Sequence, residues 1–510
     1  HASRWLADRH PGADRVPTTL DRGVQGAAER ALARFTPEAR ELGIHNAVVV
    51  VVDHENGAVR GLVGNMDFWD AEHGGQIPAF DVPRSPGSTL KPFVYGVAID
   101  RGLELPEHLV ADVPVAWGTW SPDNYDGRFS GMVRLEDALS RSLNVPFVNL
   151  LDRVGVEPFL GVMRQSGVTS IAPEPGHYGL SLVAGGIELT PLELTTMYTA
   201  LAEDGVPRAL RFSPEDPVRE LAPTMSPGSA WLVRRALTRR DRPDFPGGQG
   251  GAEPHHIHWK TGTSYGHRDA WAVGSGERYT VAVWLGNMDN RASVRLVGAA
   301  AAGPVLFDVF DALGDRGPEQ DLPTDDLEPI EVCALTGERP GPACTHTDHA
   351  LALRSASPTH RCEVHATIEV DVDTGERVLP GCRAGRQTEE RQAVVWAPEV
   401  RRYLDDPGQP LPRLAEACAD LGRSDRPRIV EPRPELVRVL VPGMAAEEQE
   451  VALEADAPPG PLDWFVDGRH LGRAAADEVV WWTPSAGKHL VVVQDRAGNT
   501  DRQWIEVRSL

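Results

Sequence analysis

The sequence predicts an α+β domain, followed by a cysteine-containing region and a small all-β sandwich. Strand-like apolar runs occur near the start and near the end of residues 26–313, and helical patterns fill the residues between them. This order is typical of one antiparallel sheet that both ends of a domain complete and that packs against helices. Residues 427–510 instead alternate short strand-like runs with turns, which is typical of a sandwich.

The early strands are predicted to form a hairpin. Asn46–Asp53 is a nearly unbroken β-branched run, and a second run follows at Val59–Gly64. Asn56-Gly57 lies between the two runs, and an Asn-Gly pair in that position is a strong hairpin signal. Residues 1–25, which precede these strands, are interpreted as a linker that enters the domain.

Three helices and three further strands are predicted next. The helical patterns begin after Pro86-Gly87 and stop at Gly102, cover Val133–Leu151 with leucines four residues apart, and cover Thr190–Ala202. The strands are predicted at Ile257–Gly262, Asp269–Val273 and Tyr279–Gly286. The helices are therefore expected to lie between two groups of strands in the sequence.

The rest of the chain is divided into two predicted parts. Residues 314–426 are predicted to be a linker and a region that holds all the cysteines, because Asp, Glu, Pro and Gly dominate residues 314–330. The sandwich that follows has roughly 85 residues, a suitable size for a small domain of this kind. Its strands are predicted at Leu436–Val441, Glu450–Glu454, Leu462–Val466, Glu478–Trp482 and His489–Gln494.

The charge of the chain excludes some partners. The formal net charge is -23, and an acidic surface repels phosphate groups and anionic lipids, so no nucleic acid partner is expected. No run of 18 apolar residues occurs, so no segment of the sequence is predicted to span a membrane. Because the sequence begins at His1 rather than at a methionine, a targeting segment is expected upstream of it.

Lysine is rare in this chain. Of the 51 basic residues only three are lysine, namely Lys91, Lys260 and Lys488. Arginine stays protonated in proteins, whereas lysine can be tuned to lose its proton and act as a base. A lysine that persists in an arginine-rich chain is therefore a candidate for chemistry that arginine cannot perform.

Ser88 and Lys91 form the first candidate pair. Side chains three residues apart share a face of a helix, so the Ser88 hydroxyl and the Lys91 amine are expected to be neighbours. Ser88 lies at the predicted helix start, where free N–H groups favour a developing negative charge. A neutral Lys91 would take the proton of Ser88 as the hydroxyl attacks a carbonyl. Taken alone, however, Ser-x-x-Lys more often marks an exposed helix start.

Two further motifs follow along the chain. Ser142 and Asn144 lie in the second predicted helix, Ser142 as a candidate proton shuttle and Asn144 as a candidate for holding a substrate peptide. Lys260-Thr261-Gly262-Thr263-Ser264 lies in a predicted strand whose edge would bind an extended peptide by strand addition. Gly262 is expected where a ligand or another backbone approaches closely. The N–H groups of Thr263 and Ser88 are expected to form an oxyanion hole, and Lys260 and Thr263 to meet a terminal carboxylate.

Together the three motifs resemble those of one protein family. Ser-x-x-Lys, Ser-x-Asn and Lys-Thr-Gly in this order are typical of penicillin-binding proteins and serine β-lactamases. Arg84–Phe93 resembles the nucleophile segment of the class A penicillin-binding proteins, and Pro122–Gly127 resembles their Pro-x-Asn-Tyr element. Further similar segments are Thr18–Asp21 with Gln25, Trp271–Gly274, Val283–Asn287, Trp464–Gly468 and Pro484–His489. The last two resemble the extra C-terminal domain of the 1C subtype.

The resemblance implies a penicillin-binding transpeptidase fold and a peptidoglycan D,D-transpeptidase activity. Ser88 would form the acyl-enzyme, and the other catalytic residues would be Lys91, Ser142, Asn144 and Lys260. The substrate-binding residues would be Thr261, Gly262, Thr263, Ser264, Asn124 and Tyr125. No cofactor and no metal is expected.

The same resemblance implies the partners and the location. The partners would be stem peptides ending in D-Ala-D-Ala, an acceptor amine on a neighbouring stem, and β-lactams. Members of the family usually carry an upstream membrane anchor and a glycosyltransferase domain, neither of which is in this sequence. The chain is therefore expected at the periplasmic face of the inner membrane, anchored by a segment outside it.

Three other functions share these motifs. A class A β-lactamase needs a Glu and a nearby Asn to hold its hydrolytic water, and none of Glu157, Glu174 and Glu188 is followed by Asn. A long-lived acyl-enzyme is therefore expected. A D,D-carboxypeptidase, which uses water as acceptor, stays open as an alternative. A sensor that is acylated without turnover also stays open, because a sensor keeps the same residues.

Histidines just before Lys260 give a further hypothesis. The run His255-His256-Ile257-His258 would place His256 and His258 on one face of a strand and His255 on the other. Closely spaced histidines can bind zinc, but no fourth ligand is indicated. The run is interpreted as ordinary strand and loop residues.

The cysteines lie close together in the sequence. They are Cys333, Cys344, Cys362, Cys382 and Cys418. Two local disulfides are predicted, Cys333 with Cys344 and Cys362 with Cys382, which leaves Cys418 free. A zinc site is the alternative, because Cys344-Thr-His346 and Cys362-Glu-Val-His365 combine cysteine and histidine at short spacing.

Overall fold

The computed structural model describes most of the chain. The residues outside the description are 115–121, 175, 240–241, 243–255, 294, 319–320, 384, 397–399, 401–402, 405–410, 419–426, 434–436, 442–448, 458–459, 496–497, 499 and 510. The chain forms two compact units, one of residues 1–113, 124–341 and 345–362, and one of residues 114–123, 342–344 and 363–510. The domain boundaries expected at residues 313 and 426 stay predictions. Within the described residues, every helix is too short or too polar to cross a membrane.

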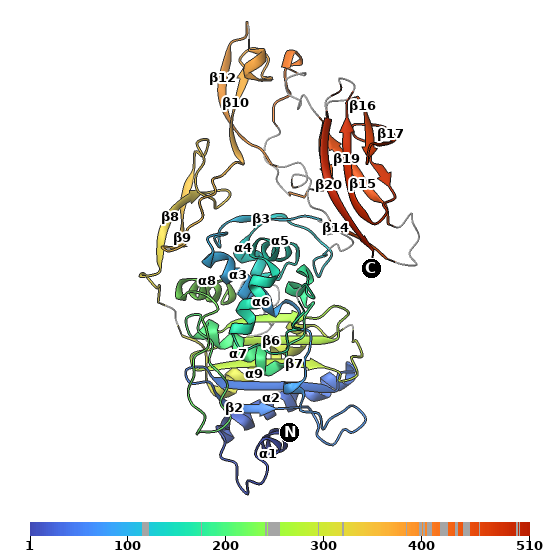
Figure 1. Cartoon of the computed structure of the whole chain (residues 1–510). Coiled ribbons are helices and arrows are strands. Elements are labelled where there is room, and N and C mark those ends of the chain that lie inside the picture. The colour runs from blue at the N-terminus through green and yellow to red at the C-terminus, as the bar shows by residue number, and fades with distance from the viewer. Residues whose placement is uncertain are drawn as a thin grey trace. The chain divides into compact units, whose positions relative to one another are not determined.

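The first unit is built on a five-stranded antiparallel sheet with the strand order β2-β1-β7-β6-β5 (Figure 1). The predicted hairpin is β1 (Asn46–Asp53) and β2 (Ala58–Val63). The late strands are β5 (His258–Thr263), β6 (Asp269–Ser275) and β7 (Tyr279–Gly286). Pairing of β1 with β7 joins the early and late groups, as the sequence predicts, and leaves β5 at an edge.

Helices cover both faces of this sheet. Helices α2 (Arg22–Glu41) and α9 (Gly298–Leu313) share a buried apolar core with alternate residues of the strands, including Val49 and Val283. Helix α7 (Pro191–Ala202) contacts β1, β6 and β7 from the other face. The remaining elements of this part are α1 (Ala2–Arg9), α3 (Lys91–Asp100), β3 (Leu109–Asp112), β4 (Gly131–Arg134), α4 (Leu135–Ser140), α5 (Val145–Val154), α6 (Val156–Gln165) and α8 (Pro227–Leu237).

Two sequence predictions about this unit need correction. The single helix predicted at Val133–Leu151 is interrupted, because Ser142 has a φ of 59° and separates α4 from α5. A left-handed residue cannot continue a right-handed helix. The segment 1–25 is more than a linker: it contains α1, and the buried Thr19 donates hydrogen bonds to the carbonyls of Val59 and Arg211.

A hairpin also occupies part of the region predicted as linker. Strands β8 (Leu327–Cys333) and β9 (Thr347–Leu353) pair antiparallel. Their alternate apolar residues bury Leu105, which precedes β3, in a small separate core. Strand β8 was not predicted from the sequence, because residues 314–330 are mostly polar. Only one face of β8 is apolar, so its apolar residues alternate with polar ones.

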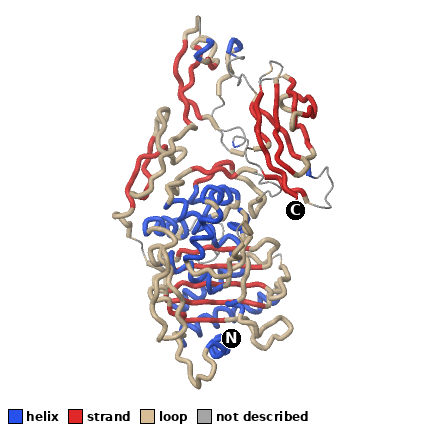
Figure 2. The backbone as a smooth tube through the Cα atoms, viewed as in Figure 1, coloured by secondary structure: helices blue, strands red, loops and turns tan. Residues whose placement is uncertain are grey.

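The second unit consists mainly of strands (Figure 2). A three-stranded sheet comes first, formed by β10 (His365–Asp371), β11 (Arg377–Val378) and β12 (Thr388–Val394). The predicted sandwich follows, with Trp464, Val491 and Ile505 in its core. Its smaller sheet is β13 (Arg428–Glu431), β15 (Val451–Asp456) and β18 (Val480–Trp482). Its larger sheet is β14 (Val437–Leu440), β20 (Thr500–Ser509), β19 (Gly487–Gln494), β16 (Pro461–Val466) and β17 (Arg469–Ala475).

The predicted disulfides are wrong. Cys382 is bonded to Cys418, with Cα atoms 5.3 Å apart, and Cys333, Cys344 and Cys362 are thiols rather than disulfides. The backbone of Arg377 in β11 exchanges hydrogen bonds with residues 413–415, which carries Cys418 to Cys382. Sequence spacing favoured shorter loops, but the pairing partner is decided by this contact between distant segments.

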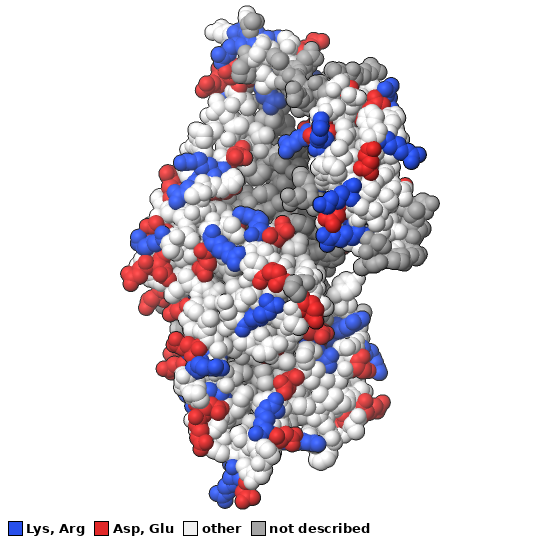
Figure 3. Space-filling model, viewed as in Figure 1, with Lys and Arg blue, Asp and Glu red and all other residues white. Residues whose placement is uncertain are grey.

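Charged side chains of both signs are interspersed over the face drawn in Figure 3. Ion pairs among the described residues include Arg239 with Asp137 and Arg208 with Glu203. The formal charge of -23 is therefore not gathered into one acidic field on this face.

Candidate active site

The nucleophile candidate Ser88 lies in a single 3-10 turn, Gly87–Leu90, directly before α3. Its side chain is half-buried. Gly87 before it has a φ of 54°, and a Cβ at this position would lie 2.6 Å from the carbonyl oxygen of Thr263. Only glycine satisfies both constraints, so the turn that carries Ser88 packs directly on the backbone of β5.

Lys91 is completely buried beside this turn. Its Nζ donates hydrogen bonds of 2.7 Å to the carbonyl oxygen of Ser142 and of 2.7 Å to Oδ1 of Asn144. Burial lowers the pKa of Lys91 well below its usual range and the charge of Lys260 lowers it further, although Asp112 raises it. A lowered pKa increases the neutral fraction of the amine, which is the form that accepts a proton.

Ser142 connects the two buried lysines. Its carbonyl accepts from Lys91, while its hydroxyl accepts a hydrogen bond of 2.8 Å from Nζ of Lys260. Lys260 also donates to the carbonyl of Thr261 at 2.9 Å. The left-handed conformation of Ser142 turns both of its oxygens toward lysines from different elements, which a helical residue would not do.

Asn124, predicted to bind substrate, lies in the interior beside Asn144. It is 4% exposed, and its Nδ2 donates to Oδ1 of Asp112 at 2.7 Å and to the carbonyl of Arg128 at 2.8 Å. Its Oδ1 accepts from the backbone N–H of Asn144 at 2.8 Å. Asn124 is therefore a positioning residue for Asn144.

Asp112 is a buried carboxylate beside the candidate site that the sequence analysis did not single out. It is fully buried at the end of β3, and no motif marks it in the sequence. Besides Asn124, it accepts the backbone N–H of Ser130 at 2.9 Å. The neighbour of Asn124, Tyr125, is 68% exposed, and its ring meets that of His267 edge to face at 5.8 Å, so Tyr125 is accessible to a ligand.

The strand motif packs against the nucleophile turn. A Cβ on Gly262 would lie 2.4 Å from the carbonyl oxygen of Pro86, so the close approach predicted at Gly262 is made by the nucleophile segment itself. Thr263 accepts the N–H of Gly298, at the start of α9, on its hydroxyl at 3.1 Å. Thr261 is 8% exposed beside Lys260.

Ser264, predicted to bind substrate, lies at the turn after β5. Its hydroxyl accepts the N–H of Asp269 at 2.8 Å, and the residue is 6% exposed. This contact closes the turn between β5 and β6, and the substrate-binding role of Ser264 stays a prediction. The next residue, Tyr265, is 97% exposed and is the accessible side chain at that turn.

His258 lies on the same strand as Lys260 and is 2% exposed. Neither of its ring nitrogens has a hydrogen-bond partner within the described part of the chain. Burial lowers the pKa of His258 well below its usual range, and the charges of Arg234 and His54 lower it further. His255 of the same run lies outside the described residues, and His256 lies two residues before β5.

This burial predicts a pH effect on stability. Because His258 stays neutral in the fold and takes up a proton when unfolded, the free energy of unfolding should fall as the pH drops below about 6.5. Chemical denaturation at several pH values gives the free energy of unfolding as a function of pH. This free energy should fall more steeply with decreasing pH in the wild type than in His258→Leu, by up to about 1.4 kcal/mol per pH unit. The exposed His10→Ala serves as control and should keep the wild-type slope. Equal slopes in the wild type and His258→Leu would contradict the assignment.

Comparisons with known proteins identify the domains of this chain. Residues 47–293 match the model of the penicillin binding protein transpeptidase domain, and residues 416–507 match that of the Penicillin-Binding Protein C-terminus Family. Penicillin-binding protein 1C of Escherichia coli (strain K12) is 31% identical over 501 residues, which cover 94% of this chain and 64% of that protein. Penicillin-binding protein 1A of Neisseria gonorrhoeae is 27% identical, covering 72% of this chain and 47% of that protein. The chain therefore spans less than two thirds of the length of either relative.

Solved structures show the same fold. Penicillin-binding protein 1A from Haemophilus influenzae superposes with a TM-score of 0.52 and 20% identity, covering 62% of this chain and 54% of that chain. The penicillin-binding protein PonA1 from Mycobacterium tuberculosis gives a TM-score of 0.51 and 21% identity, covering 63% of this chain and 92% of that chain. The two family models, the 1C relative and the fold all indicate the same family. This chain belongs to the class A penicillin-binding proteins of the 1C type and contains their transpeptidase and C-terminal domains.

Proposed function

We propose that this chain is a peptidoglycan D,D-transpeptidase that uses Ser88 as its nucleophile and that β-lactams inhibit. The observation that carries the proposal is the fully buried Lys91, whose amine is held beside the Ser88 turn by Ser142 and Asn144. A buried lysine with a lowered pKa is suited to general base catalysis rather than to structural ion pairing.

In the first step, Oγ of Ser88 attacks the carbonyl carbon of the penultimate D-alanine. Lys91 takes the hydroxyl proton, and the N–H groups of Ser88 and Thr263 stabilise the oxyanion. The peptide bond then breaks, and the departing amine of the terminal D-alanine receives a proton through the hydroxyl of Ser142, which the contact with Lys260 orients. The products are free D-alanine and an ester of Ser88.

In the second step, an amine from a neighbouring stem peptide attacks this ester. Ser142 and Lys91 accept the proton that the amine loses, the tetrahedral intermediate collapses, and Ser88 recovers its own proton. A new amide bond forms, and the enzyme returns to its starting state. The edge position of β5 allows the extended donor peptide to pair with this strand during both steps.

The proposed substrate also determines the place of action. Stem peptides are cross-linked outside the cytoplasm, so the chain would work at the periplasmic face of the inner membrane. The disulfide between Cys382 and Cys418 suits an oxidising compartment. The membrane anchor and the glycosyltransferase domain implied by the resemblance stay expectations.

Labelling with a fluorescent penicillin tests the nucleophile. We expect one adduct per chain, and peptide mapping should find it on Ser88. The variant Ser88→Ala should give no adduct, whereas Ser355→Ala, at an exposed serine outside the site, should label like the wild type. An adduct on another residue, or no adduct on a folded wild-type protein, would overturn the assignment.

Product analysis separates the transpeptidase from its two alternatives. The protein is incubated with a stem pentapeptide ending in D-Ala-D-Ala and with an amine acceptor. Release of D-alanine together with a cross-linked peptide supports the proposal. A tetrapeptide acid as sole product would identify a carboxypeptidase, and an acylated protein without any peptide product would identify a sensor.

A further inference from the structure

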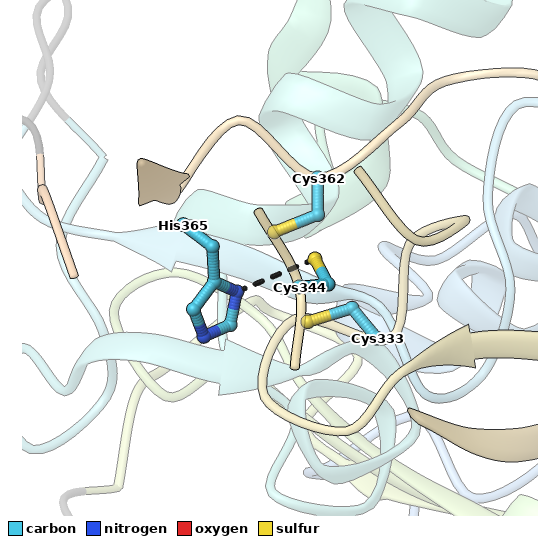
Figure 4. Close-up of side chains that lie close together, drawn as sticks. All are labelled: Cys333, Cys344, Cys362 and His365. Atoms are coloured by element: carbon cyan, nitrogen blue, oxygen red, sulfur yellow. Dashed lines mark hydrogen bonds between the residues drawn. The ribbon is translucent and has the colours of Figure 1, made fainter. Parts of the chain in front are cut away.

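Three cysteines that are not disulfide-bonded and one histidine lie close together outside the catalytic motifs (Figure 4). Sγ of Cys333, Cys344 and Cys362 and one ring nitrogen of His365 all lie within 4.8 Å of one another. In the close-up, the three sulfur atoms and the imidazole ring point toward a common centre, and Nδ1 of His365 lies 3.5 Å from Sγ of Cys344. All four residues belong to one stretch of 33 residues, counted from Cys333 to His365.

Local backbone contacts hold two of the cysteines in place. Cys333 ends β8, and its N–H donates to the carbonyl of Glu338 at 2.7 Å, which closes a tight turn. The N–H of Cys362 donates to the carbonyl of Arg339 at 2.8 Å, which holds the later part of the stretch beside the same turn. The cluster is therefore built by short-range chain contacts and does not arise from unrelated side chains on the surface.

Burial distinguishes this cluster from a chance group. Cys333 and Cys362 are 0% and 3% exposed, and Cys344 and His365 are half-buried. The other histidine near Cys344, His346, is exposed and bonds to the hydroxyl of its neighbour Thr345. Of the two histidines that the sequence offered for a zinc site, the structure brings only His365 into the cluster.

The separations suit a tetrahedral metal. A Zn–S bond of about 2.3 Å implies ligand atoms roughly 3.8 Å apart in a regular tetrahedron. Ligand atoms within 4.8 Å of one another need only a small contraction to reach that arrangement. Three cysteines and one histidine are a common ligand set for structural zinc, and soft thiolates disfavour magnesium, calcium and manganese.

Hydrogen-bond donors surround the sulfur of Cys333. This sulfur accepts hydrogen bonds from the N–H groups of Leu335 and Thr336 and from the hydroxyl of Thr336. Backbone N–H groups directed at a cysteine sulfur stabilise negative charge there without adding a counter-ion.

We propose that Cys333, Cys344, Cys362 and His365 bind one zinc ion that holds the stretch 333–365 in its fold. All four positions of the tetrahedron are filled by protein, which leaves none for water or substrate, so the role is structural rather than catalytic. The metal takes the place of a hydrophobic core in a short stretch that has few apolar residues to bury. It also protects three neighbouring thiols from oxidation, in a chain whose other two cysteines form a disulfide.

Elemental analysis of the purified full chain tests this proposal. We expect one zinc ion per chain after dialysis against a weak chelator. The variants Cys362→Ser and His365→Ala should lose the metal. Two matched controls should keep it: His346→Ala, at the exposed neighbouring histidine, and the double variant Cys382→Ser with Cys418→Ser, at the disulfide. Retention of zinc by Cys362→Ser and His365→Ala, or loss from the controls alone, would overturn the assignment.

A second measurement uses the unaltered protein, in case a variant fails to fold. Thiol titration of the native chain should find the three cysteines protected until a strong chelator removes the metal, and three thiols should then react. Reconstitution with Co²⁺ should give the intense visible bands of a tetrahedral thiolate site. A chain that stays free of metal after zinc reconstitution, or unreduced peptides that link Cys333 to Cys344 or Cys362, would overturn the proposal and leave the transpeptidase assignment untouched.

Discussion

Replacing Lys91 by methionine should lower the rate of acylation by penicillin by about 10² to 10⁴-fold, the usual contribution of a general base. Methionine has nearly the length of lysine and no amine, so it fills the same buried space without accepting a proton. The carbonyl of Ser142 and Oδ1 of Asn144 each lose a donor, at a cost of about 1–3 kcal/mol in the free energy of unfolding for each group left unsatisfied. The protein should remain folded but slow to acylate.

The rate is measured with a fluorescent penicillin at several concentrations, and folding is followed by thermal denaturation. Lys488→Met is the matched control, because Lys488 is an exposed lysine in β19 and should have no effect on acylation. Lys91→Arg should be as slow as Lys91→Met, since arginine does not release its proton. A rate for either Lys91 variant within about tenfold of the wild type would show that another group is the base.

Replacing Gly262 by alanine should separate the nucleophile turn from β5. The added Cβ would lie 2.4 Å from the carbonyl oxygen of Pro86 and 2.8 Å from Cγ2 of Thr89. The first of these is a backbone atom with little room to move, so the turn that carries Ser88 has to shift. Displacement of a reacting group by about 1 Å can cost about 100-fold in rate, and we expect at least that loss in acylation. Overpacking of this kind should also lower the free energy of unfolding by about 1–3 kcal/mol.

Gly161→Ala is the matched control for this experiment. Gly161 lies in α6, and a Cβ there would have nothing within 4 Å. The control should acylate like the wild type and gain about 0.5–1 kcal/mol in the free energy of unfolding, because alanine is the better helix former. Unchanged acylation in Gly262→Ala would mean that the contact between β5 and the nucleophile turn does not set the position of Ser88.

The sequence was sufficient for features that depend on local pattern. The run Asn46–Asp53 and the Asn56-Gly57 pair predicted a hairpin that the structure contains, since strand propensity and turn chemistry act over a few residues. The scarcity of lysine indicated Lys91 and Lys260 before any geometry was known, and both prove to be fully buried in one hydrogen-bonded group with Ser142. The order of the three motifs and the family also followed from the sequence.

Contacts between distant residues were decided only by the tertiary structure. Leucine spacing predicted one helix through Ser142, but the positive φ of this residue, held between two lysines, ends the helix there. Nothing in the sequence indicated that Asn124 contacts Asp112 and the N–H of Asn144 in the interior.

The cysteines show the same limit. Short spacing favoured Cys333–Cys344 and Cys362–Cys382, whereas the pairing of residues 413–415 with Arg377 carries Cys418 to Cys382. Spacing along the chain sets the entropy of closing a loop, which grows only slowly with loop length. Packing between remote segments outweighs the small difference in loop-closure entropy between short and long loops. The sequence by itself therefore determined which residues carry the chemistry. The tertiary structure decided which of these residues lie in contact.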